Sequence, residues 1–260
     1  MAKVVEKGVV KAEPLNLDKF LGEAQWNRIK LIGIELEGAW EGNPAGQKVV
    51  RDGSVFKEAG DDGGVRRATM PGLVVGEIQL GPMVPAGMTT LMRKVYPKLL
   101  DPSCGLHVHM SFSKVLHYRL LMIPEYPETI LYYLTRWAEK EKLPKEHPIW
   151  ARLKGNSEFC QNKFWPDAQM QTRVKDWNKE RYGHRYTVVH FGWERQRTVE
   201  VRVLPMFKEV EQALSAIKMV LNVTNATLLH VSKTFKRNDS GVLSMPNGDL
   251  YEEQTQEIVK

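Results

Sequence analysis

The sequence has little cysteine, no long hydrophobic run and no repeated segment. Its 260 residues include only two cysteines, Cys104 and Cys160, too few for a disulfide framework, so both are expected as free thiols. No apolar run approaches the ~20 residues that a membrane-spanning helix needs. The lack of a repeat excludes solenoid architectures. The length suits one domain with one core.

The amino-terminal segment lacks the apolar stretch of a secretory signal, so a cytoplasmic protein is expected. Lys and Arg number 37 against 31 Asp and Glu, a net charge of +6. The basic residues lie in short, scattered groups such as 66–67 and 233–237. This distribution does not favour a nucleic-acid partner, because such partners select a concentrated basic surface.

Alternating and helical patterns predict an α+β fold. Period-two alternation predicts strands at 31–37, 73–80, 106–112, 185–191 and 198–204. A helix is predicted at 88–100, short helical pieces at 124–181, and a long amphipathic helix at 208–235. We expect a lead-in at 1–30, one domain at 31–235 and a polar tail at 236–260. Strands interrupted irregularly by helices favour a sheet with helices packed on one face.

Four predicted strands each carry a strongly polar face. Residues i and i+2 of a strand point to the same side, so Glu35 and Glu37 project together while their neighbours point away. The other three strands show the same pattern in the pairs Glu77 and Gln79, His107 and His109, and Glu200 and Arg202. If these strands form one sheet, its polar face is either bathed in solvent or lines a cavity.

The negative charge of these side chains indicates which ions such a cavity would have to bind. The glutamates at 35, 37, 77 and 200 would require about two divalent cations to lie together. Carboxylates with one or two imidazoles suit Mg²⁺ or Mn²⁺, and the absence of clustered cysteines argues against structural zinc. Arg202 adds a phosphate-binding fork, which together with two metals is typical of phosphoryl transfer. No Walker motif is present.

Six motifs occur in an order that resembles a known superfamily. They are GIELEG (33–38), DGS (52–54), GEIQLGP (76–82), CGLHVHMSF (104–112), RYTVVH (185–190) and TVEVRVLP (198–205). Across 31–207 the chain resembles the glutamine-synthetase-like carboxylate–amine ligases, and most of all their amidoligase branch, which is related to glutamate–cysteine ligases. The resemblance implies a curved, mainly antiparallel sheet whose concave face holds ATP and two or three Mg²⁺ ions. ATP would phosphorylate a carboxylate, and an amine would then displace the phosphate.

The resemblance also implies metal ligands and residues around the phosphates. One metal, on the ATP phosphates, would be held by Glu35, His107 and Glu200. A second, nearer the acid substrate, would be held by Glu37 and Glu77. The remaining implied site residues are Arg185 and Arg202 on the transferring phosphoryl group, His109 on the acid-binding side of the cofactor site, and Asp52.

Three positions leave alternatives open. Asp52, with Ser54, either contacts the amine or forms a turn. His190 stands where the family usually has asparagine, and its parity is opposite to that of Arg185, so a core histidine is favoured there. Cys104 is either a nucleophile or, as we favour, a small buried residue at a strand start.

Two other function classes compete with the ligase. One is a two-metal nuclease or phosphohydrolase, and the other is a non-catalytic binding protein that retains the fold. The expected partners are a small-molecule or peptide carboxylate and an amine, with no membrane.

Overall fold

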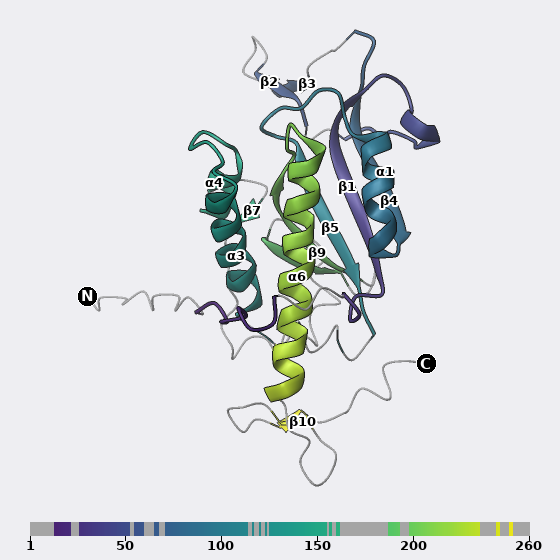
Figure 1. The fold of residues 1–260 in the computed structure, drawn as a ribbon. Coiled ribbons are helices and arrows are strands. Elements are labelled where there is room, and N and C mark those ends of the chain that lie inside the picture. The colour runs from purple at the N-terminus through teal and green to yellow at the C-terminus, as the bar shows by residue number, and fades with distance from the viewer. Residues whose placement is uncertain are drawn as a thin grey trace, which may run out of the picture.

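Figure 1 shows the fold of the chain in a computed structural model. The structure describes residues 13–21, 26–52, 55–59, 65–67, 71–113, 116, 120, 123, 125–154, 156–157, 160–161, 187–192, 198–234, 243–244 and 250–251. The predicted carboxy-terminal tail lies mostly outside these residues.

A five-stranded sheet forms the centre of the described chain. Its spatial order is β4-β1-β5-β9-β8, and every neighbouring pair is antiparallel. The strands span Leu31–Trp40 (β1), Val74–Met83 (β4), Gly105–Ser111 (β5), Val189–Gly192 (β8) and Thr198–Pro205 (β9). The α+β class and the antiparallel sheet are therefore confirmed. The predicted strand at 185–191 is described only from 189 onward.

The helices lie between and after the strands. They span Met88–Val95 (α1), Tyr126–Lys140 (α3), Ile149–Leu153 (α4) and Val210–Thr234 (α6), with 3₁₀ turns at Pro44–Gly46 (η1) and Pro85–Gly87 (η2). The prediction for α1 is wrong beyond Val95, because Tyr96 precedes a proline and is extended. None of the helices among the described residues is both long and apolar enough to cross a membrane.

Short paired strands complete the described elements. They are β2 (Lys57–Ala59) with β3 (Val65–Arg67), β6 (Asn156–Ser157) with β7 (Cys160–Gln161), and β10 (Leu243–Ser244) with β11 (Leu250–Tyr251).

The apolar side of the sheet packs against the helices. Ile34, Leu36 and Val108 are fully buried in one hydrophobic cluster that includes residues of α6 such as Leu221. In Figure 1, α6 lies across one face of the sheet. On one side of α6, α1 lies over β1 and β4, and on the other side α3 runs alongside α6. Leu17, from the segment predicted as a lead-in, is also buried in this cluster. The helices thus cover the apolar face of the sheet, and the polar side chains project from the opposite face.

A register shift between β5 and β9 sets which residues of β9 face which side. His109 is paired with Glu200, but Leu106 is paired with Leu204, so β9 uses one more residue over this stretch. An extra residue changes the parity of a strand. Glu200 therefore belongs to the polar side, while Leu204 returns to the apolar side.

Candidate metal centre

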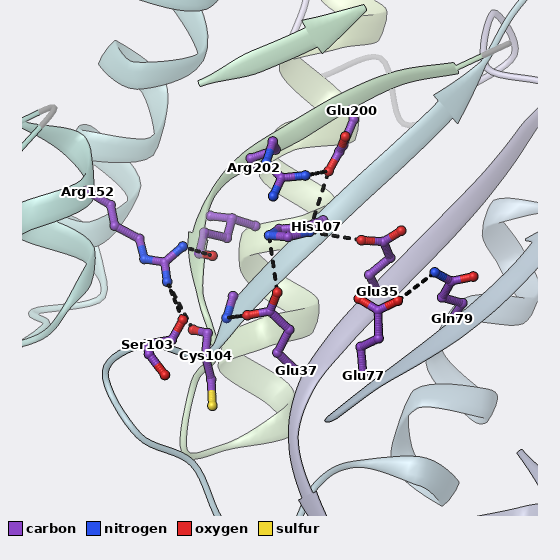
Figure 2. A network of polar contacts seen from close by, with 12 residues as sticks. Glu35, Glu37, Glu77, Gln79, Ser103, Cys104, His107, Arg152, Glu200 and Arg202 are labelled. Atoms are coloured by element: carbon purple, nitrogen blue, oxygen red, sulfur yellow. Dashed lines mark hydrogen bonds and ion pairs between the residues drawn. The ribbon is translucent and has the colours of Figure 1, made fainter. Parts of the chain in front are cut away.

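The polar residues of the sheet are brought together by strand register. Glu37 is paired with Glu77, and Glu35 with His107. His109 is paired with Glu200 on the next strand. Because directly paired residues project from the same face, three strand pairings collect six side chains. Figure 2 labels these side chains except His109, together with Gln79 beside Glu77 and Arg202 beside Glu200.

The first group of possible metal ligands consists of Glu35, His109 and Glu200, which we call the mixed site. Each contributes one ligand atom, and these atoms lie within 4.8 Å of one another. His109 Nε2 is 3.1 Å from Glu35 Oε1 and 3.9 Å from Glu200 Oε1. Glu200 is only 3% exposed. Buried carboxylates this close together need a positive charge between them.

The second group consists of Glu37, Asp52 and Glu77, which we call the all-oxygen site. Their ligand atoms also lie within 4.8 Å of one another. Asp52 reaches this position because Val50 forms two backbone hydrogen bonds of 2.8 Å with Glu77 at the edge of β4. The close approach requires Gly76, where a Cβ atom would overlap the Val50 carbonyl oxygen. The structure thus places Asp52 beside two glutamates.

His107 lies between the two sites. Its Nδ1 is 3.0 Å from Glu35 Oε2, and its Nε2 is 3.9 Å from Glu37 Oε1. Glu37 also accepts a hydrogen bond from the backbone N–H of Gly105. A Cβ atom at Gly105 would lie 2.7 Å from His107 Nε2. The absent side chain at this position therefore leaves room for the imidazole.

No known family model matches the chain, and neither a curated protein nor a solved structure matches it. The chemistry of this face is therefore deduced from its own residues.

Burial and neighbouring charge shift the acidic groups in opposite directions. Burial disfavours the charge of Glu35, but the polar contacts and charges of His107 and His109 outweigh it and lower its pKa. Burial raises the pKa of Glu37, and burial together with the charge of Glu35 raises the pKa of Glu77. For His109, burial opposes protonation, but Glu35 and Glu200 outweigh it and raise the pKa. These shifts show that the face favours added positive charge.

Divalent cations fit these residues. Both groups offer carboxylate oxygens, which bind Mg²⁺ and Mn²⁺, and the mixed site adds an imidazole. The buried Nε2 of His109 has no hydrogen-bond partner in the described part of the chain, although it lies against Glu35 and Glu200. A nitrogen in that position is suited to coordinate a cation shared with the two carboxylates.

Two buried arginines flank the cluster. Arg202 pairs through Nη1 with Glu200, and its Nε has no hydrogen-bond partner among the described residues. Arg152, on α4, donates hydrogen bonds to the carbonyl oxygens of Leu204, Ser103 and Cys104 and lowers the pKa of Glu37 by its charge. Arg152 is not predictable from the sequence as a site residue, because no local motif marks it within the region between 113 and 181.

Four other predicted positions have different outcomes. Arg185 and Ser54 lie outside the described residues. His190 is paired with Glu200 across β8 and β9 and is half-buried, so it faces the polar side rather than the core position that its parity favoured. Cys104 is buried, and burial raises the pKa of its thiol, which opposes a role as a nucleophile.

Proposed function

We propose that the chain is an ATP- and Mg²⁺-dependent ligase that joins a carboxylate to an amine through an acyl phosphate. One observation carries the proposal: the mixed site and the all-oxygen site lie on one face of an antiparallel sheet, next to the buried Arg202. Two cation sites beside an arginine suit the transfer of a phosphoryl group. The choice of a ligase among such enzymes rests on the resemblance of the six motifs to the glutamine-synthetase-like superfamily, whose fold we propose for the sheet.

Each part of the face has a role in this proposal. When bound, the cations neutralise the triphosphate and polarise the transferring group. The mixed site would hold one cation, and the all-oxygen site would hold the other. Asp52 would act as a ligand of the second, because the structure places it with Glu37 and Glu77. Arg202 would face the charge that develops on the transferring group, a role typically worth several kcal/mol.

The proposed reaction has two steps. A carboxylate oxygen of the acid substrate attacks the γ-phosphorus of ATP, and the bond to the β-γ bridging oxygen breaks to release ADP. The amine nitrogen then attacks the acyl carbon. The carbon–oxygen bond to phosphate breaks, and inorganic phosphate, the amide and a proton are formed. Both steps build negative charge on phosphate oxygens, so both depend on the same cationic surroundings.

The test combines a substrate screen with charge-removing variants. Purified protein is incubated with Mg²⁺, ATP and pools of amino acids and polyamines, and ADP and phosphate are measured. We expect ADP release that depends on an added acid and amine, and its loss in Glu35→Gln and Glu200→Gln. Glu211→Gln is the matched control, since Glu211 is an exposed partner of Arg93.

The outcomes separate the function classes. Unchanged turnover in either glutamine variant of the mixed site would remove that residue from the site. Cleavage of DNA or RNA without ATP would replace the ligase with a two-metal nuclease. No turnover in either assay and no ATP-dependent thermal shift would leave a binding protein.

A further inference from the structure

The two ring nitrogens of His109 have different surroundings. Nδ1 is 3.3 Å from Thr198 Oγ1, to which it can donate a hydrogen bond. Nε2 points to the carboxylates of Glu35 and Glu200 and has no hydrogen bond within the described residues. The residue is 8% exposed. A proton held on Nδ1 by the hydroxyl leaves the Nε2 lone pair directed at the two carboxylates, as in histidines that bind metals.

The nitrogen of His107 that faces the mixed site is already hydrogen-bonded. His107 Nδ1 is hydrogen-bonded to Glu35 Oε2 at 3.0 Å and lies 3.5 Å from Glu200 Oε1, whereas Nε2 lies 3.9 Å from Glu37 Oε1, which belongs to the all-oxygen site. A hydrogen bond from an imidazole to a ligating carboxylate orients that carboxylate. His107 is therefore placed to hold Glu35, whereas His109 is placed to coordinate.

The mixed and all-oxygen sites also differ in donor chemistry. The all-oxygen site offers carboxylates alone, which suit Mg²⁺. The mixed site adds an imidazole nitrogen, which shifts the preference of a site toward first-row transition cations. The mixed site has two carboxylates and one imidazole, and the all-oxygen site has three carboxylates, so only the mixed site offers a nitrogen ligand.

We propose that His109 Nε2 is the imidazole ligand of the mixed site, that Thr198 positions it, and that this site takes a first-row transition cation while the all-oxygen site takes Mg²⁺. This differs from the motif resemblance, which implies His107 as the ligand. The inference rests on the proposed function only in taking both groups as cation sites, and it needs neither ATP nor turnover.

Pulsed electron paramagnetic resonance of bound Mn²⁺ tests the ligand. The whole protein is first given excess Mg²⁺, which is expected to fill the all-oxygen site. One equivalent of Mn²⁺ is then added. We expect nitrogen coupling to Mn²⁺ that disappears in His109→Gln and persists in His107→Gln. Glu77→Gln is the control for the second site and should retain the coupling. Thermal melts establish that each variant is folded.

Variants of Thr198 test the positioning role without changing a ligand. Thr198→Val keeps the shape but removes the hydroxyl, and it should weaken Mn²⁺ binding roughly 10–100-fold, the usual effect of losing a hydrogen-bond partner of a ligand. Thr198→Ser keeps the hydroxyl and should restore the affinity. Mg²⁺ binding should be nearly equal in the two variants.

Several results would overturn the inference. They are coupling lost in His107→Gln but kept in His109→Gln, no nitrogen coupling in the unaltered protein, or equal Mn²⁺ affinity in the valine and serine variants. Nitrogen-coupled Mn²⁺ in a protein without ligase activity would refute the proposed function alone. An active ligase whose Mn²⁺ shows no nitrogen coupling would refute this inference alone.

Discussion

Replacing Arg152 with methionine tests whether the buried guanidinium supports the polar face. Arg152 is 4% exposed and donates three hydrogen bonds, at 3.2–3.3 Å, to the carbonyl oxygens of Leu204, Ser103 and Cys104. Methionine has a similar length and no donor, so the three carbonyls lose a charged partner and Glu37 loses a nearby positive charge. Leaving a buried acceptor without its hydrogen-bond donor costs about 1–3 kcal/mol. We expect a loss of that size in the free energy of unfolding.

Urea denaturation measures this loss through the transition midpoint. Arg136→Met is the control, because Arg136 and its partner Asp18 form an ion pair at the surface, where such pairs contribute little to stability. Arg152→Lys keeps the charge without the planar fork and should fall between the two. A loss for Arg152→Met no larger than that of the Arg136 control would refute the assigned role.

The pH dependence of this variant has a definite sign. Burial raises the pKa of Glu37 in the folded, cation-free protein above its unfolded value, and Arg152 partly opposes that rise. A group with a raised acidic pKa lowers stability as pH increases through the window between the unfolded and folded values. Without Arg152 that window widens. The deficit of Arg152→Met should therefore be larger near neutral pH than near the unfolded pKa of a glutamate.

Two further predictions concern cation binding. Gly105→Ala would place a Cβ atom 2.7 Å from His107 Nε2 and 3.1 Å from Glu37 Oε2, so it should sharply reduce the Mg²⁺-induced rise in Tm. Gly87→Ala is the control, because the space around its Cβ is open and the rise in Tm should be unchanged. Equal thermal shifts in the two variants would contradict this prediction. Because burial raises the pKa values of Glu37 and Glu77, Mg²⁺ must displace protons, and its thermal shift should be larger at about pH 8 than at about pH 5. A shift independent of pH would show that these carboxylates do not bind the cation.

The strands and their polar faces were predictable from local pattern. The alternation around Glu35 and Glu37 forces both side chains to one side, whatever the rest of the chain does. The same argument paired His107 with His109 and Glu200 with Arg202. These predictions succeed because side-chain direction in a strand depends only on the backbone of that strand.

Arg152, His190 and Asp52 were not predictable in the same way. Arg152 acts through backbone carbonyls about 50 residues distant in the sequence, and no residue pattern near Arg152 indicates those partners. His190 faces Glu200 because β8 is paired with β9 in one particular register. Asp52 joins two glutamates because the chain at Val50 pairs with the edge of β4. Each depends on contacts between distant segments.

The amino-acid sequence by itself determined which side chains share a face, because the two-residue period of a strand is a local property. Only the tertiary structure decided which faces meet, and it did so through strand order and register. The order β4-β1-β5-β9-β8 gathers the carboxylates and imidazoles into two adjacent sites. Pairing is selected by burying the opposite, apolar side against the helices, so the polar face is assembled by the packing of residues that never touch it.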